Sequence, residues 1–457
     1  MKRAIAALLA ATTTTAGCSA SAAGTEVEIV IGYQSKTINT VTAGTLLRKL
    51  GFFEKRLADL SARTGTKYTV TWQDYATGAP ITAEMIAGKV DIGSMGDFPL
   101  LINGSRTQDK GDEGTRMVSV TGYSATGGLN MVVVPPDSPA KTLADLKGTT
   151  VSASVGSAGH GTLVRALQRA GVEDVTVENQ QPSIGASALQ AGSVSALAQF
   201  VAWPGMLVHG KQARLLYDGS ALGIPTLHGV VVRKPFATEH PDLLTEFLRA
   251  QLDATEYLHA DPLAAAESVA AETGLDPEVV YLYNGPNGIS TFDLDIKPRL
   301  RQALREDVPL LERIGDIKPL DVDAFIDDTA VSAIVGPADD DTTNPARITG
   351  RDEVCGVDVA DPATASELWL VGEAETRPAA TPTCLLKNIN AAGGEVRAAY
   401  VPDAETGTRW FADHAVWVRD GADFLDFSTA DAARRHTAAH PGAQVLDYAA
   451  ALKAAGR

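Results

Sequence analysis

The sequence is short of cysteine, of basic residues and of long apolar runs. Its 457 residues include 3 cysteines, and 39 lysines and arginines stand against 56 aspartates and glutamates. The formal net charge of −17 argues against a nucleic-acid partner, because phosphate binding needs clustered lysine and arginine. After the N-terminal segment, no run of residues is long and apolar enough to span a membrane. The length and the 45% share of hydrophobic residues favour a globular chain of about two to four domains.

The N-terminus has the pattern of an export signal. Two basic residues precede a short apolar run and then small residues. The segment TAGC (15–18) resembles a bacterial lipobox, in which cleavage leaves the cysteine as the lipidated first residue. We therefore expect a signal peptide over 1–17, a lipid on Cys18, a tether over 18–25, and an extracytoplasmic protein anchored to the membrane. The alternative is an ordinary signal peptide with a cysteine there by chance.

Residues 26–335 alternate between strand and helix patterns. Apolar strands such as EVEIVIGY, KYTVTWQDY and VDIGSMG are separated by helical segments, which predicts a parallel sheet covered by helices. A second series starts near GLNMVVVPP, and long helices follow from residue 240. The pattern predicts an α/β fold of two lobes joined by crossing segments, with the ligand outside the carboxyl ends of the strands.

Three predicted strand ends carry small and polar residues that suit a ligand. They are GYQSKT, VDIGSMGDFP and GSAGHGT, and the last one precedes a helix. In that loop the glycines let an oxyanion approach the backbone, and the free N–H groups and the helix dipole favour an anion. A tight turn without a ligand is the alternative. The expected ligand-binding residues of these loops are Gln34, Ser35, Ser94, Gly96, Ser157 and His160.

Asp97, at the end of the second loop, admits two interpretations. Its carboxylate could accept hydrogen bonds from an amine of the ligand, or it could cap a turn through backbone N–H groups. We favour the cap, with Ser94 and Gly96 as the main ligand contacts of this loop, and we keep Asp97 among the candidate ligand residues.

Several segments, in this order, resemble the substrate-binding lipoproteins of ABC importers for nitrate, taurine and alkanesulfonates. They are IGYQ (31–34), ITAEMIAGKVDIGSMGDFP (81–99), SPAKTLADLKGTTVSASVGSAGHGTLVRALQRAGV (138–172), LQAGSVSALAQFVAWPGM (189–206) and HPDLLTEFLRAQLDATEYLHADP (240–262). The resemblance implies a type II periplasmic binding protein clamp, a small anionic or zwitterionic solute, and an ABC permease with its ATPase as partners. It also adds Gln199 and Trp203 as ligand residues, because the family reaches its ligand from the second lobe near this place.

The lobes offer little for catalysis. Some thiamine-precursor synthases share the binding-protein fold and use histidines and cysteines, but residues 26–335 contain no cysteine. Their histidines are scattered, without a pair at metal-binding spacing. We therefore predict a binding protein with no catalytic residue and no cofactor, and an enzyme of that type is the less favoured alternative.

The end of the chain has a different pattern. A segment rich in Pro, Gly and Asp over 336–350 indicates a linker, and short strands around a helix predict a small α+β domain over 351–457. Three parts of this domain carry a resemblance: CGVDVADPATASELWLVGE, TPTCLLKNI and the stretch from YVPDAETGTRW to AQVLDY. They resemble the copper-chaperone lipoproteins associated with nitrous-oxide reductase (NosL-type). The resemblance implies copper handling as an alternative function.

The cysteines of this domain leave two alternatives open. The Met of the family's Cys-Gly-Met element is missing here, where Val357 follows Cys355 and Gly356. A disulfide between Cys355 and Cys384 is the favoured alternative, as is usual for a cysteine pair in an oxidising compartment. The other is a Cu(I) site. Its ligands would be Cys355, Cys384 and His414, with His436 and His440 as further imidazole candidates.

Overall fold

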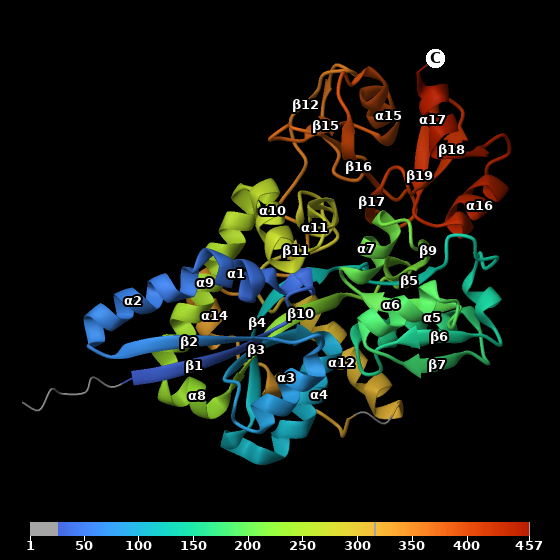
Figure 1. The fold of residues 1–457 in the computed structure, drawn as a ribbon. Coiled ribbons are helices and arrows are strands. Elements are labelled where there is room, and N and C mark those ends of the chain that lie inside the picture. Colours follow the sequence, from blue (N-terminus) through green and yellow to red (C-terminus); the bar gives the residue numbers. More distant parts are fainter. Residues whose placement is uncertain (1–25, 315–316, 457) are drawn as a thin grey trace, which may run out of the picture.

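The computed structural model describes residues 26–314 and 317–456 (Figure 1). The predicted signal peptide (1–17), Cys18 and the tether (18–25) lie outside the described residues. Two α/β lobes and a smaller C-terminal domain, drawn in orange and red, make up the described part (Figure 1). No helix in this part has the length and apolar character needed to cross a membrane.

The first lobe is built on a six-stranded sheet with the order β11-β4-β10-β3-β1-β2. β1 (Glu26–Tyr33) pairs in parallel with β2 (Lys67–Asp74) and β3 (Ile92–Gly96). β10 (Thr226–Arg233) is antiparallel to β3 and to β4 (Thr115–Ser124), and β11 (Thr291–Phe292) is antiparallel to β4. The three strands for which the sequence predicted a parallel arrangement, β1, β2 and β3, are therefore parallel as expected. β10 enters the sheet on its return from the second lobe, so it runs against its neighbours.

Helices cover both faces of this sheet. Along β10, Val231 faces a core formed with α3 (Gly78–Ile86), α4 (Asp97–Thr107) and α12 (Pro298–Arg313). Val230 and Val232 face the other core, formed with α2 (Phe52–Thr64) and α9 (Pro241–Ala260). This alternation is the two-residue period of a strand that is buried on both sides. Smaller helices complete the lobe: η1 (Ile38–Ala43), α1 (Thr45–Leu50), η2 (Gln108–Glu113), α8 (Lys234–Glu239), α13 (Val322–Phe325) and α14 (Thr329–Val335).

The sequence indicated a turn at GDFP, but α4 begins there without an intervening loop. Gly96 ends β3 and is also the residue before the first helical residue, Asp97. Pro99 lies in the first turn of α4, where a missing N–H removes no intrahelical hydrogen bond. Burial of Leu100 and Leu101 in the core then holds the helix. The strand end thus delivers a helix N-terminus to the space between the lobes.

The second lobe has a five-stranded sheet with the order β7-β6-β8-β5-β9. β6 (Thr150–Ala153), β7 (Thr176–Asn179) and β8 (Ala196–Phe200) are parallel, and β5 (Asn130–Val134) is antiparallel to β8 and β9 (Arg214–Asp218). Its helices are α5 (Ala158–Ala170), α6 (Pro182–Gln190), α7 (Trp203–His209) and the short η3 (Leu143–Leu146) and η4 (Gly219–Leu222). The chain crosses between the lobes after β4 and returns after β9, as predicted.

The C-terminal domain has two small sheets and three helices, which agrees with the predicted α+β class. One sheet holds β15 (Arg377–Ala379), β14 (Ser366–Leu370), β16 (Val396–Pro402) and β17 (Arg409–Phe411). The other holds β19 (Asp423–Phe427), β18 (Val416–Asp420) and β20 (Gln444–Leu446). The helices are α15 (Pro382–Ala391), α16 (Ala430–Ala439) and α17 (Tyr448–Ala455), and β12 (Arg351–Asp352) and β13 (Val357–Asp358) form a short ribbon.

This domain is docked on the binding lobes. It meets α11 (Pro277–Asn284), which follows α10 (Pro262–Thr273), at a shared aromatic core. Arg409 forms a buried ion pair with Glu367 (2.7 Å) and lies over the ring of Tyr281, a residue of α11. Near the second lobe, the hydroxyls of Thr406 and Thr408 donate to Asp218 at the end of β9 (2.8 and 2.6 Å). The described contacts therefore attach the domain to α11 and to the second lobe.

Candidate functional site

A cavity of about 220 Å³ lies between the two lobes; because residues at six strand ends line it, it is called the main cavity below. The first lobe contributes residues at the ends of β1, β2 and β3, and the second lobe contributes residues at the ends of β6, β7 and β8. The cavity therefore lies at the carboxyl ends of the strands, where open α/β sheets bind ligands.

Three helix N-termini line this cavity. Thr77 precedes α3, Gly96 precedes α4 and Ser157 precedes α5, and all three residues contribute to the lining. The first N–H groups of a helix have no intrahelical partner, and the helix dipole places a partial positive charge there. Helices from both lobes thus direct donors and positive potential into one space, which suits an anion.

Among the described residues that line the main cavity, Arg106 is the one with a charged side chain. It lies in the last turn of α4 and is exposed. Within the described part of the chain it makes no hydrogen bond or ion pair, so its guanidinium is available to a ligand. No aspartate or glutamate lines this cavity, so the electrostatic character of the described lining is positive.

His228 adds a neutral donor to the lining. Burial lowers the pKa of His228 to about 3, so its imidazole is uncharged at neutral pH. Asn39 Nδ2 donates to Gly122 O (3.2 Å) and lies 2.7 Å from His228 Nδ1, which must therefore accept. The proton is then on Nε2, the ring atom beside Gly96.

The sequence-predicted residues fall into three groups. Gln34, Gly96 and Ser157 line the main cavity. Ser35 and Trp203 line a second cavity of about 270 Å³ together with Lys36, Asp74 and Tyr75. The other four, which do not line either cavity, are Ser94, Asp97, His160 and Gln199.

The two cavities adjoin, because consecutive residues are divided between them. Each pair has one member on the main cavity and its neighbour on the second: Gln34 and Ser35, Thr77 and Ala76, Gln181 and Pro182. Residues of both lobes also line the second cavity. The carboxylate of Asp74 in its wall accepts from the backbone N–H and the hydroxyl of Ser35 (2.8 and 2.6 Å). The cleft is therefore elongated, with an aromatic wall at Trp203.

The four residues outside the lining hold the cleft in shape. Asp97 is buried and accepts from the backbone N–H groups of Phe98 (2.8 Å) and Leu227 (3.2 Å), so it connects the first turn of α4 to β10. Burial raises its pKa to about 6. Ser94 accepts from Gln34 Nε2 through its backbone carbonyl (3.2 Å).

The remaining two belong to the second lobe. The hydroxyl of Ser157 accepts from the backbone N–H of His160 (3.3 Å), which caps α5. Gln199 is fully buried and donates from Nε2 to Ser154 Oγ (3.1 Å). Ser154 lines the main cavity, so Gln199 lies one residue behind the wall.

The glycines of the loop GSAGHGT mostly serve protein packing. A Cβ on Gly159 would lie 2.9 Å from the backbone of Gln199, and one on Gly161 would lie 2.1 Å from the ring of Phe98. Gly156 alone of these has a positive φ (81°) and lines the cavity. The expectation that these glycines open the backbone to an oxyanion therefore applies to Gly156 and is wrong for the other two, which let α5 approach β8 and the first lobe.

An ion pair also links the lobes beside the cavity. Arg165 on α5 lies 2.5 Å from Asp307, a buried residue of α12. Burial raises the pKa of Asp307, and the nearby negative charge of Asp97 adds to this effect. With the Gly161–Phe98 contact, this pair forms a second point at which α5 meets the first lobe.

The sequence reasoning missed several lining residues. Thr77 follows the end of β2 and precedes a helix, so the rule applied to the other strand ends would have found it. Arg106, Asn179, Gln181, Phe200 and His228 also line the main cavity. Arg106 gave no such signal, because α4 itself was not predicted.

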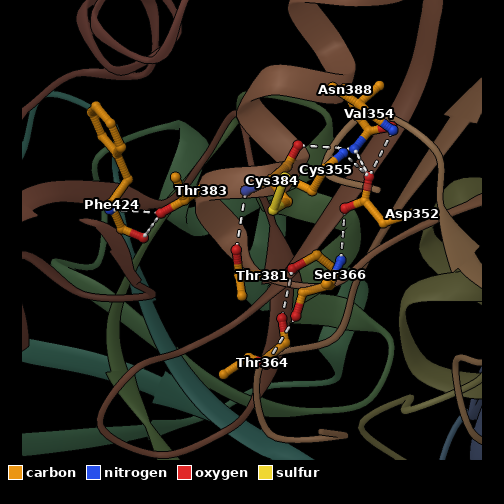
Figure 2. The surroundings of a disulfide bond; sticks show 11 residues. Asp352, Val354, Cys355, Thr364, Ser366, Thr381, Thr383, Cys384, Asn388 and Phe424 are labelled. Atoms are coloured by element: carbon orange, nitrogen blue, oxygen red, sulfur yellow. Dashed lines mark hydrogen bonds between the residues drawn. A yellow bond between two sulfur atoms is a disulfide. The ribbon is translucent and has the colours of Figure 1, made fainter. Parts of the chain in front are cut away.

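The structure joins Cys355 to Cys384 in a disulfide (Figure 2). Asp352 organises its surroundings: its carboxylate accepts from the backbone of Cys355 (2.9 Å) and Ala380 (3.0 Å) and from Asn388 Nδ2 (3.0 Å) (Figure 2). Among the described residues, the group around these two cysteines with ligand atoms close enough for a metal contains Asp352 as its third member, and His414 is not part of it. The ligand set proposed from sequence for Cu(I), which included His414, is therefore not brought together.

The sequence is similar to one known protein family and to several known proteins. Residues 69–265 match the family model described as NMT1/THI5 like. The taurine-binding periplasmic protein of Escherichia coli (strain K12) is 30% identical over 199 residues, which are 42% of this chain and 59% of that protein. A putative aliphatic sulfonates-binding protein of the same strain is 26% identical over 255 residues, or 55% and 74% of the two chains. The chain thus spans about three fifths of the length of the first of these relatives.

Among solved structures, the alkanesulfonate-binding protein SsuA from Xanthomonas axonopodis pv. citri, bound to MOPS, superimposes with a TM-score of 0.55. It is 23% identical, and the alignment covers 67% of this chain and 100% of that one. The chain has the periplasmic binding protein fold. Its C-terminal sheets form a small extra domain beyond that fold.

Proposed function

We propose that this chain is the solute-binding component of an ABC importer and that its solute is an organic sulfonate. The observation that carries the proposal is the convergence of three helix N-termini and Arg106 on one cavity between the lobes. A sulfonate spreads one negative charge over three oxygens, so each helix start has an oxygen to which it can donate. The similarity to binding proteins for taurine and aliphatic sulfonates supports this assignment.

The lining favours a sulfonate with an uncharged tail. The main cavity has no described carboxylate that could pair with the ammonium of taurine, and apolar groups of Ile102, Val155 and Phe200 lie in its wall. A tail that leaves this cavity enters the second one, where Trp203 offers an aromatic face and the carboxylate of Asp74 already accepts two hydrogen bonds from Ser35. Nitrate would leave most of this elongated space unfilled. We therefore rank alkanesulfonates above taurine and nitrate as solutes.

In this proposal the two lobes act as a clamp, and no residue acts in catalysis. Ligand bound to the N-termini of α3 and α4 on one lobe and of α5 on the other favours closure, because both halves then contact the same anion. Closure excludes water and strengthens the polar contacts. The loaded protein would dock on the permease, whose ATPase drives uptake. Location outside the cytoplasm, suggested by the periplasmic relatives, fits the export signal.

Isothermal titration calorimetry on the full chain tests the solute. The panel is nitrate, bicarbonate, taurine, and alkanesulfonates of increasing chain length. We expect alkanesulfonates to bind most tightly and affinity to rise with tail length until the second cavity is filled. Tighter binding of nitrate or bicarbonate would refute the sulfonate assignment. Tighter binding of taurine, which is itself a sulfonate, would refute the preference for an uncharged tail, and the absence of binding by every member would refute the anion-binding role of the cleft.

We further propose that Cys18 carries the lipid anchor. Fractionation of cells that express the chain should place it with the membrane, and Cys18→Ser should release it in soluble form outside the cytoplasm. Retention of the Cys18→Ser protein on the membrane would show that the anchor is elsewhere.

A further inference from the structure

A cluster of two imidazoles and one carboxylate lies in the C-terminal domain, away from the cleft. Its members are Asp420, the last residue of β18, His436 in the last turn of α16, and His440, which follows the end of α16. One ligand atom from each lies within 4.8 Å of the others. His440 is exposed, and the other two are partly buried.

The atoms of the cluster have nearly the spacing of a metal site. His436 Nε2 and Asp420 Oδ2 are 3.0 Å apart. In a tetrahedral zinc site with bonds of about 2.0–2.2 Å, neighbouring ligand atoms are about 3.3–3.6 Å apart, so an ion fits between these two after a shift of a few tenths of an ångström. The exposed side chain of His440 has the freedom to close the remaining distance.

The tautomer of His440 is also suited to a metal. The His440 ring stacks on that of His436, with centroids 3.9 Å apart and an angle of 16° between the planes, so the exposed His440 ring has to turn to direct its lone pair at the ion that His436 binds. His440 Nδ1 lies 2.9 Å from the backbone carbonyl of His436, which can only accept, so Nδ1 carries the proton and Nε2 has the free lone pair. A hydrogen bond of this kind from the second ring nitrogen commonly orients a metal-binding histidine.

The protein supports two of the ligands from behind. The ring of His436 packs against Phe427 of β19 at a centroid distance of 5.3 Å. Asp420 is held in the β18–β19 ladder, opposite Asp423. The hairpin β18–β19 and the helix α16 that follows it thus present these two ligands from defined positions.

We propose that Asp420, His436 and His440 form a surface site for a borderline divalent cation, with Zn²⁺ as the favoured ion. Two imidazole nitrogens and one carboxylate oxygen suit Zn²⁺, Cu²⁺ or Ni²⁺, whereas Cu(I) prefers sulfur and Ca²⁺ prefers oxygen. The fourth position is left to water or to a ligand from a partner. The bound ion joins α16 to the β18–β19 hairpin, so this site goes beyond solute binding in the cleft and differs from a copper site at the cysteines.

Calorimetric titration of the full chain with ZnSO₄ tests the site. The protein used for this titration carries the substitution Cys18→Ser. Cys18 is the cysteine outside the disulfide, and its thiol would otherwise offer zinc a further ligand. We expect uptake of one equivalent, and we expect His440→Ala and Asp420→Asn each to weaken binding about tenfold or more. His414→Gln is the matched control: this histidine is in the same domain beside Asp413 but outside the cluster, and its loss should leave zinc binding unchanged.

A second readout identifies the ligands independently of affinity. Co²⁺ bound in place of Zn²⁺ should show the visible absorption of a four- or five-coordinate nitrogen and oxygen site, without a sulfur-to-metal band, and His440→Ala should change it. The proposal is overturned by absence of stoichiometric uptake, by uptake that persists in His440→Ala, or by uptake that His414→Gln abolishes. Alkanesulfonate affinity should be unchanged in His440→Ala, so a failure of the cleft assignment does not affect the result.

Discussion

Arg106 gives the main cavity its positive charge, and its loss should reduce solute affinity without affecting the fold. It makes no contact that stabilises the described part of the chain, and a charge-assisted hydrogen bond to an anion contributes about 1.5–3 kcal/mol. Arg106→Gln should therefore weaken sulfonate binding about 10- to 100-fold, measured by calorimetry. The melting temperature without ligand should not change.

Arg313→Gln is the control for this prediction, because Arg313 is an exposed arginine near the end of α12 that does not line the main cavity. Its loss should leave sulfonate affinity within twofold of the wild type, roughly the error of the measurement. Equal losses in both variants would mean that net charge, and not a contact with Arg106, attracts the ligand.

Asp426 should make the stability of the protein depend on pH. Its side chain is fully buried, and neither carboxyl oxygen has a hydrogen-bond partner among the residues that the structure describes. Burial raises its pKa well above the usual range, and the negative charge of Asp403 adds to this. The folded chain therefore keeps a proton that the unfolded chain releases above about pH 4, so this residue lowers the free energy of unfolding by about 1.4 kcal/mol per pH unit until it ionises in the fold.

The variant Asp426→Asn cannot ionise, so it should lose this dependence. Urea unfolding of the variant and the wild type should show a stability difference that shifts in favour of the variant between about pH 5 and pH 8. Asp423→Asn, which changes an exposed residue of the same strand, should show no such shift. A constant difference across this range would show that Asp426 is ionised in the folded protein.

At the residue scale, the sequence located the right strand ends but not the right side chains at each. Gln34, Gly96 and Ser157 line the cavity because a strand end leads directly into it. Ser94 and His160, in contrast, are buried and line neither cavity. Ser94 contacts Gln34 through its backbone carbonyl, and His160 Nδ1 accepts from the backbone N–H of Gly156 (3.4 Å). Side-chain direction depends on the packing of both lobes, which no local pattern records.

At the element scale, the close approach of α5 to α4 determines how far the lobes can close. Gly161 on α5 faces Phe98 on α4, and a Cβ there would lie 2.1 Å from the ring. Gly161→Ala should therefore hinder the closed form and weaken sulfonate binding about tenfold or more, because the binding-competent conformation becomes less populated. Calorimetry measures the affinity, and small-angle scattering with saturating ligand should show a larger radius of gyration than in the wild type.

Gly393→Ala is the control, because a Cβ at this exposed glycine meets no atom within 4 Å. It should bind and close like the wild type. Wild-type affinity in Gly161→Ala would mean that Phe98 moves aside and that this contact does not limit closure.

The long helices were predicted correctly from their apolar periodicity, whereas a short helix with a proline in its first turn was missed. The long helices after residue 240 were found from their apolar spacing and occur as α9, α10 and α12. α4 was missed because Pro99 suggested a turn, although proline is compatible with a first helical turn. The direction of β10 was also not predictable, because it follows from the path of the chain between lobes.

At the scale of the whole molecule, the disulfide should stabilise the C-terminal domain in particular. Cys355 and Cys384 are 29 residues apart, and closing a loop of this size stabilises by about 3–4 kcal/mol in the chain-entropy model. The double variant Cys355→Ser, Cys384→Ser should lower the melting temperature of this domain, followed by calorimetric scanning. Sulfonate affinity should be unchanged, since the disulfide contacts neither cavity.

Reducing agent applied to the wild type serves as the matched control and should reproduce the melting curve of the double variant. If neither treatment changes the curve, the domain is held by its aromatic core with α11 and by the buried Arg409–Glu367 pair, and the disulfide adds no stability.

The division of the cleft into two adjoining cavities has an evolutionary consequence. The helix N-termini that hold the charged head belong to the main framework of both lobes, whereas the second cavity is bordered by Lys36 and Trp203. Substitutions at these two positions can alter the preferred length or shape of the tail while the head group stays bound. A lineage that carries this fold can therefore move from one organic anion to another through changes at one end of the cleft, without passing through a form that binds none.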